Sequence, residues 1–250
     1  MKSLAEARPT KTALNLALSR LEIRLLLTFL AVSAILTAFI RLTSEVREGE
    51  TSRFDTSIVL AFRVAGELGT AVGPRWVQES ARDFTALGGV TVLTLITVVG
   101  IALLWMHGRR LQALVFGATV VLAQIASEVL KHFIGRQRPT IVPQHDLVYS
   151  SSFPSGHAMM APVVYLALAA ILAAGDRRRG VKVILLVGAV GIVLAVGTSR
   201  VYLGVHWPTD VIAGWTLGLA FAVAAAFFLH ATAPVRGPNT AIQPDTPGVK

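Results

Sequence analysis

The chain has no cysteine and little charge. Without cysteine, its 250 residues cannot form disulfide bonds, thiolate metal sites or a cysteine nucleophile. Asp, Glu, Lys and Arg make up 15% of the residues, against about 25% in soluble proteins. Hydrophobic residues make up 54%, and the mean hydropathy is +0.64. This composition excludes a disordered chain, a coiled coil and most soluble enzymes.

Long apolar runs dominate the sequence instead. A helix that crosses a bilayer needs about 20 mostly apolar residues. The runs predict six membrane spans, at residues 25–40, 86–105, 111–130, 157–174, 181–198 and 211–229. The predicted fold class is therefore all-α, a six-transmembrane-helix bundle within residues 25–230. Small residues allow helices to approach closely in lipid, and they recur at Gly117, Gly188, Gly191, Gly197, Gly214 and Gly218.

The first run has a second interpretation, a cleaved signal peptide, because a basic segment precedes it. The run is long and no convincing small-residue cleavage site follows it. We therefore expect an uncleaved span that follows an N-terminal segment of residues 1–24.

The net charge is +9. In a soluble protein such an excess of positive charge would indicate nucleic-acid binding. In this apolar chain we expect no nucleic-acid partner and interpret the positions of the charges relative to a bilayer instead. The short turns 107–110 and 176–179 are rich in arginine, which places them on the cytoplasmic side. Both termini are then cytoplasmic. The tail, residues 231–250, is rich in Pro, Gly and Thr and is expected to be disordered.

The first extracytoplasmic loop, residues 42–85, is long and of mixed charge. Apolar residues fall near helical spacing within it, at Phe54, Ile58, Val59, Phe62 and Ala65, with Trp76 and Phe84 before the second span. The pattern predicts interfacial amphipathic helices with aromatic anchors. Surface helices packed on the bundle are the alternative.

A first motif, from Lys131 to Pro139, follows the third span. Lys131 and Arg138 are seven residues apart and would share a helix face if the helix continued. Gly135 and Pro139 are residues that loosen or end a helix. Arginine supplies a planar fork for phosphate and lysine a point charge. An ordinary interfacial basic cluster is the alternative.

A second motif, from Ser151 to Ala158, opens the fourth span. Ser155 is a natural N-cap, and Gly156 lets a ligand approach the backbone. The free N–H groups of a first helical turn bind anions. His157 would project beside that site. A capped helix with an interfacial histidine is the alternative.

A third motif, from Ser199 to Asp210, joins the fifth and sixth spans. Pro208 suits a first helical turn. His206 and Asp210 are four residues apart, so the carboxylate can reach one imidazole nitrogen and leave the other as a nucleophile or base. A solvated loop anchored by Trp207 is the alternative.

The three motifs together indicate a function far more specifically than any one of them alone, since all three fall on the same side of the membrane in the six-span topology. They supply Lys131, Arg138 and Arg200, a helix N-terminus, two histidines and Asp210. Such groups suit phosphoryl transfer to a nitrogen nucleophile. Carboxylates are too sparse for a two-metal phosphatase, so we expect no metal and no cofactor.

At these residues the sequence resembles the type 2 phosphatidic acid phosphatases, also called lipid phosphate phosphatases. Their signature is Lys-x6-Arg-Pro, then Pro-Ser-Gly-His, then Ser-Arg-x5-His-x3-Asp. It is matched without departure at residues 131–139, 154–157 and 199–210. The motifs and the spans between them cover about half of the chain. The resemblance implies a metal-independent phosphatase with a phosphohistidine intermediate.

The resemblance also implies a role for each matched residue. His206 would be the nucleophile, Asp210 would orient it, and His157 would serve as acid and then base. The phosphoryl oxygens would be bound by Lys131, Arg138, Arg200, Ser155 and Gly156. Four nearby residues outside the signature would support the site or contact the headgroup: Glu128, His132, Arg136 and His145.

The predicted function is hydrolysis of a lipid phosphate or pyrophosphate at the outer face of a bacterial inner membrane. Undecaprenyl pyrophosphate is the first expectation, with phosphatidylglycerol phosphate, phosphatidic acid and a lipid A phosphate as alternatives. A phosphate-binding transporter or scaffold is a remote alternative, since no span is visibly broken at mid-membrane. Oxidative chemistry is a further alternative, because the family that the sequence resembles shares its phosphate pocket with the vanadium haloperoxidases. Those enzymes are soluble and longer than this chain. The sequence does not indicate an oligomeric state.

Overall fold

The computed structural model describes residues 11–144, 150–176 and 178–232. Helices make up most of this part of the chain. In chain order the elements are α1 (Lys11–Glu48), α2 (Ser52–Ala61), β1 (Arg63–Val64), β2 (Glu67–Ala71), α3 (Arg75–Leu87), α4 (Val90–Met106), α5 (Arg110–Ile134), α6 (Gly156–Ala161), the π-helical turn η1 (Pro162–Leu166), α7 (Ala167–Gly175), α8 (Arg179–Tyr202) and α9 (Pro208–Ala231).

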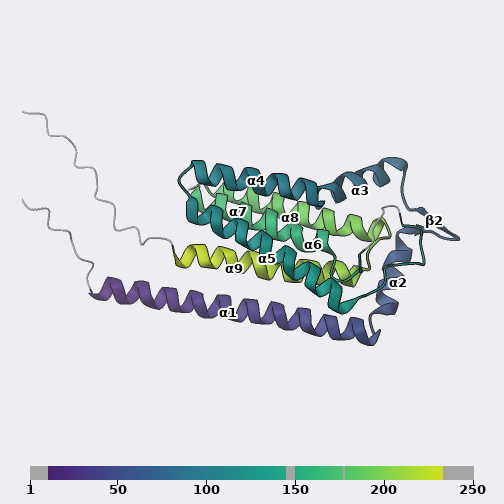
Figure 1. Cartoon of the computed structure of the whole chain (residues 1–250), viewed down its shortest axis with the longest axis horizontal. Coiled ribbons are helices and arrows are strands. Elements are labelled where there is room, and N and C mark those ends of the chain that lie inside the picture. Colours follow the sequence, from purple (N-terminus) through teal and green to yellow (C-terminus); the bar gives the residue numbers. More distant parts are fainter. Residues whose placement is uncertain (1–10, 145–149, 177, 233–250) are drawn as a thin grey trace, which may run out of the picture.

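The long helices lie side by side along one axis, as predicted for a membrane bundle (Figure 1). Within the described residues, five helical segments are long and apolar enough to cross a bilayer, and the pair α3–α4, bent by 46°, makes a sixth when it is counted as one span. The short elements α2, β2 and α3 gather at one end of the bundle, while α1 begins and α9 ends at the other (Figure 1). The predicted six-span all-α fold is confirmed.

The fourth span is continuous but not uniform. It runs through α6, η1 and α7, with a π-helical turn that begins at Pro162. Proline has no N–H to donate and its ring crowds the preceding turn, which accounts for the local widening at this position. The span lies in the middle of the bundle, and Val163 and Val164 are fully buried.

The first loop is more structured than expected. Helix α1 continues to Glu48, beyond the predicted end at residue 40, and α2 and α3 are the two helices that the apolar spacing indicated. Helix α2 ends at Ala61, however, and an unpredicted antiparallel hairpin, β1–β2, follows it. Phe54 and Trp76 are exposed. Their location at a membrane interface stays a prediction.

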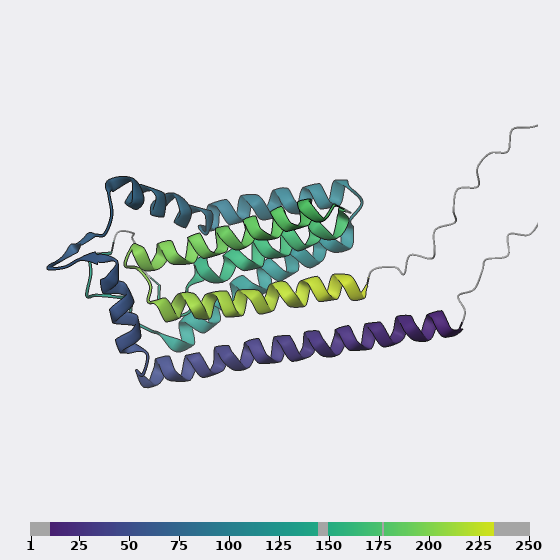
Figure 2. The same cartoon turned by 180° about the vertical axis from the view of Figure 1, so that it is seen from behind.

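Helix α1 is the most peripheral span. Seen from behind, it runs along α9 and extends beyond the C-terminal end of that helix (Figure 2). Only Phe39 and Val46 of its described side chains are buried. The helix already begins at Lys11, within the predicted N-terminal segment 1–24. The predicted tail lies almost wholly outside the described residues.

Glycines set the closest helix contacts, although not all of the predicted ones do. A Cβ at Gly214 would lie 2.7 Å from the Ser155 carbonyl oxygen, so α9 packs directly on the backbone of α6. At Gly218 a Cβ would overlap the Met159 carbonyl group. By contrast, a Cβ at Gly188 or Gly191 would meet nothing within 4 Å, so these two glycines do not mediate close packing.

This contrast gives a matched test of packing. We expect Gly218→Ala to lower the free energy of unfolding by about 1–3 kcal/mol, because the new methyl group forces α9 away from α6. Gly188→Ala makes the same chemical change in open space and should be neutral or slightly stabilising. Thermal unfolding in detergent measures both variants. Equal midpoints would contradict this account of the α6–α9 contact.

Candidate active site

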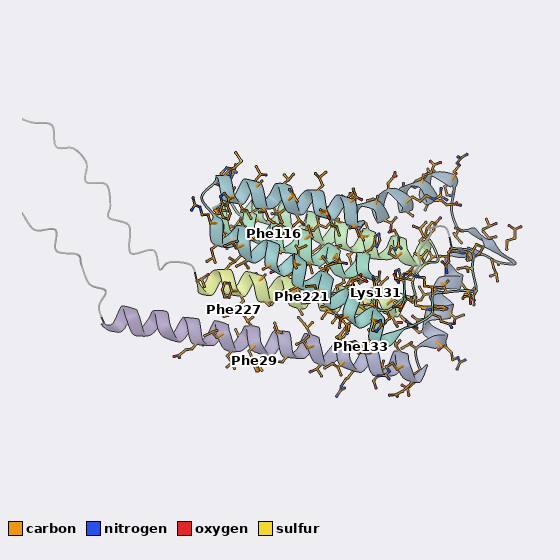
Figure 3. The ribbon with its side chains drawn as sticks, viewed as in Figure 1. Phe29, Phe116, Lys131, Phe133, Phe221 and Phe227 are labelled. Carbon is orange, nitrogen blue, oxygen red and sulfur yellow. The ribbon has the colours of Figure 1, made fainter. Side chains whose placement is uncertain are left out.

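The three motifs meet at the end of the bundle that carries α2 and the hairpin. Figure 3 shows Lys131 at this end. A cavity of about 590 Å³ opens here. Six of the eight predicted site residues line it: Lys131, Arg138, Gly156, His157, Arg200 and His206. The other two, Ser155 and Asp210, are fully buried.

The two basic residues of the first motif reach the cavity from two different backbone segments. Lys131 lies in the last turn of α5, and Gly135 ends the helix with a left-handed φ of 61°. Gly135 thus ends the helix, as its residue type indicated, and Lys131 and Arg138 do not share a helix face. Arg138 lies instead on an irregular segment, where its Nε donates to the Ser150 carbonyl oxygen at 2.9 Å.

The second motif brings the start of the fourth span to the same place. Ser155 is the N-cap of α6, as predicted, and its Oγ accepts from the Ala158 N–H at 3.5 Å. A Cβ on Gly156 would lie 3.2 Å from the Lys131 ammonium nitrogen. The bare backbone of Gly156 therefore leaves room for the lysine beside the first helical turn. His157 follows at the cavity wall.

The third motif forms the floor of the site. Helix α8 ends at Tyr202, and Pro208 opens α9 at its first position, as predicted. His206 lies between them and is 2% exposed. Its Nδ1 is 3.4 Å from Oδ2 of Asp210, so the predicted pair is present. Arg200 of α8 donates to the Thr85 hydroxyl at 2.8 Å.

Asp210 collects donors from three separate segments. Its Oδ2 accepts from the Ser152 hydroxyl and from the Trp207 N–H. Its Oδ1 accepts from Arg136 Nη1 at 2.5 Å. A carboxylate without solvent exposure needs such compensation for its lost hydration. With these donors in place, Asp210 holds the Nδ1 edge of His206 and directs Nε2 toward the cavity.

The Nε2 atom of His206 faces Arg138. The Nη1 atom of Arg138 lies 3.0 Å from Nε2 and also donates to the Val205 carbonyl oxygen at 2.7 Å. Guanidinium nitrogens only donate, so Nε2 acts as the acceptor and the ring proton is on Nδ1, facing Asp210. Any reaction of Nε2 would use that same lone pair, so Arg138 would first have to release it.

Burial keeps His206 neutral. Desolvation lowers its pKa from 6.5 to about 4, and the positive charges of Arg138 and Arg200 act in the same direction, while Asp210 opposes them. A histidine with a lowered pKa stays unprotonated as the pH falls, until the pH approaches the lowered value. At neutral pH the imidazole is therefore an available nucleophile or base.

The cavity continues away from the charged groups as an apolar groove between α4 and α5. Val90 and Val98 of α4 and Val121 and Ile125 of α5 line it. All four side chains are also exposed on the outside of the bundle. The groove therefore opens sideways, where a bilayer would surround the protein. An apolar chain could lie there while a phosphate occupies the basic end.

Several residues near the site were not predicted from the sequence. Asp55 of α2 is 1% exposed and forms an ion pair with Arg136 at 2.7 Å. Ser152 and Thr85 hold Asp210 and Arg200, respectively. One signal could have revealed Asp55: it is four residues before Val59, which places a carboxylate on the buried face of α2.

The four residues outside the signature differ in their surroundings. Glu128 lines the cavity and pairs with Lys131 at 3.1 Å. Arg136 forms an ion pair with Asp210, which fits the supporting role expected of it. His132 is exposed on the last turn of α5. His145 lies outside the described residues.

Comparison with known proteins agrees with this arrangement. A sequence profile of the PAP2 superfamily matches residues 112–232, a range that includes all three motifs. Phosphatidylglycerophosphatase B of Bacillus subtilis is 38% identical over 152 residues, which cover 58% of this chain and 71% of the relative. The chain belongs to the PAP2 superfamily. The resemblance seen in the motifs is thereby confirmed.

Two further proteins are similar to this chain. The undecaprenyl-diphosphatase of Sulfolobus acidocaldarius is 34% identical, over 49% of this chain and 57% of the relative. The crystal structure of the first transmembrane PAP2-type phosphatidylglycerolphosphate phosphatase from Bacillus subtilis superimposes with a TM-score of 0.75 at 28% identity, over 82% of this chain and 98% of that one. The predicted enzyme class, a lipid phosphatase, is confirmed at the level of the family.

The environment of His206 can be tested without substrate. We expect its imidazole to remain neutral down to about pH 5, because burial favours the uncharged ring. A ¹⁵N-histidine NMR titration in detergent follows the protonation, with the His206 signals assigned by their loss in His206→Ala. A His206 midpoint near 6.5, the ordinary value for a histidine side chain, would contradict the account.

Proposed function

We propose that the protein hydrolyses a lipid phosphate or diphosphate through a phosphohistidine on His206, without a metal ion. One observation carries the proposal. The buried His206–Asp210 pair faces a cavity that also contains His157 and three basic side chains and that opens sideways between α4 and α5. A single-tailed or double-tailed lipid phosphate has the matching shape, with a charged head and an apolar chain.

In the first step, the Nε2 lone pair of His206 attacks the phosphorus atom. The phosphorus–oxygen bond to the leaving group breaks as the phosphorus–nitrogen bond forms. Protonated His157 gives its proton to the departing oxygen, and Asp210 stabilises the positive charge that develops on His206. The hydrogen bonds on Asp210 from Ser152 and the Trp207 N–H keep that carboxylate in place during the reaction.

In the second step, His157 is neutral and takes a proton from water. The water oxygen attacks the phosphorus atom, the phosphorus–nitrogen bond breaks, and its electron pair returns to Nε2. Inorganic phosphate leaves and His157 is again protonated. Lys131, Arg138 and Arg200 neutralise the equatorial oxygens in both steps, with the Gly156 N–H and Ser155 at the start of α6.

The first substrate that we propose is phosphatidylglycerol phosphate, and the second is undecaprenyl pyrophosphate, the first expectation from the sequence. The activity for which the Bacillus subtilis relatives are named supports the first, and that for which the Sulfolobus relative is named supports the second. We further propose that the site faces the outside of a bacterial inner membrane and that both termini are cytoplasmic. The arginine-rich turns 107–110 and 176–179 support this orientation.

The nucleophile can be tested directly. His206→Ala should abolish release of inorganic phosphate, with a loss on the order of 10⁴-fold or more, because no group remains to accept the phosphoryl group. EDTA should leave the wild type unaffected. His107→Ala removes an exposed histidine from the turn between α4 and α5, at the other end of the bundle, and is the matched control. Full activity of His206→Ala would contradict the assignment of His206 as the nucleophile. Loss of wild-type activity with EDTA would contradict a reaction without a metal ion.

The substrate can be tested with purified protein in detergent and four lipids: phosphatidylglycerol phosphate, undecaprenyl pyrophosphate, phosphatidic acid and a lipid A phosphate. We expect the highest kcat/KM with phosphatidylglycerol phosphate. A soluble phosphate ester without a tail should be far poorer, because it leaves the groove between α4 and α5 unfilled. A preference for the diphosphate would reverse the order of the two proposed substrates.

A further inference from the structure

A buried carboxylate outside the sequence motifs is bonded to the helix that carries Asp210. Asp55 of α2 accepts from the Thr209 N–H at 3.0 Å and from the Thr209 hydroxyl at 2.7 Å. Thr209 is the second residue of α9, so its N–H is one that the helix itself cannot satisfy. Asp55 therefore caps α9 from another helix, and its negative charge suits a helix N-terminus.

The same carboxylate is linked to the catalytic pair through one arginine. Arg136 donates from Nη2 to Asp55 at 2.7 Å and from Nη1 to Asp210 at 2.5 Å. The two carboxylates are almost fully buried, and the arginine is 16% exposed. One guanidinium thus compensates two buried negative charges, and this part of the site keeps a formal charge of −1.

We propose that Asp55 is a positioning residue for the phosphatase reaction, acting on His206 through Arg136 and Asp210. Because Asp55 and Asp210 share one guanidinium, Arg136 neutralises Asp210 only in part. Asp210 therefore interacts more strongly with the Nδ1 edge of His206. In addition, the cap on Thr209 fixes the first turn of α9, which fixes Asp210 relative to His206. The role in turnover rests on the proposed phosphohistidine, whereas the electrostatic link does not.

Charge counting predicts effects of opposite sign. In Asp55→Asn the net charge of the three groups rises from −1 to 0, so His206 should become harder to protonate. In Arg136→Gln it falls to −2, so His206 should become easier to protonate. The double variant restores −1 and should return toward the wild type. The other charged or titratable groups that share the cavity with His206 are unchanged in all three variants: Arg138, Arg200, His157, Lys131 and Glu128.

The experiment compares these three variants with the wild type in two assays. In the ¹⁵N-histidine titration, without substrate, we expect the His206 midpoint to move by about 0.5 pH unit or more, downward in Asp55→Asn and upward in Arg136→Gln. In the phosphate-release assay, Asp55→Asn should lower kcat about tenfold while KM changes less than twofold. The double variant should have a higher kcat than Asp55→Asn alone.

Asp83→Asn is the matched control, because Asp83 is exposed on α3 and takes no part in the network. Shifts of the same sign in both single variants, or no shift, would overturn the proposal. A loss in Asp55→Asn that appears in KM instead of kcat would also overturn it. If Asp55→Asn does not fold, Arg136→Gln and the double variant still decide the sign of the effect. Activity of His206→Ala would refute the phosphohistidine while leaving the titration result valid.

Discussion

The structure depends on the burial of one charge, the carboxylate of Asp210. A carboxylate without exposure is tolerated only when donors replace its hydration. Those donors are Arg136, Ser152 and the residues that precede α9, and they come from segments far apart in the sequence. The span topology places the motifs at the same end of the bundle, and the bonds to this one carboxylate hold segments of all three together there.

The cavity at this end of the protein combines two environments. Basic side chains and two histidines line one part of the cavity, and exposed valine and isoleucine side chains of α4 and α5 line the other. A charge in an apolar surrounding interacts more strongly than one in water. Burial also lowers the pKa of His206, because desolvation disfavours the charged ring.

The sequence predicted the spans and the convergence of the motifs, because both depend on strong local signals. Apolar runs of sufficient length form membrane helices whatever surrounds them, and Ser155 and Pro208 mark helix starts locally. The sequence left open whether the helix continues to Arg138, and the left-handed backbone of Gly135 turns the chain before that residue. The bond from Asp55 to Thr209 joins residues 154 positions apart, and no local spacing could predict such a partner.

The central claim is that one tetrahedral oxyanion is held by all three motifs and bonded to His206. An experimental structure with orthovanadate bound tests it most directly, since vanadate adopts the five-coordinate geometry of phosphoryl transfer. The account predicts a vanadium–Nε2 bond at His206, with Arg138 moved from Nε2 to an equatorial oxygen. Vanadate bound away from His206, or in contact with only one of the motifs, would contradict it.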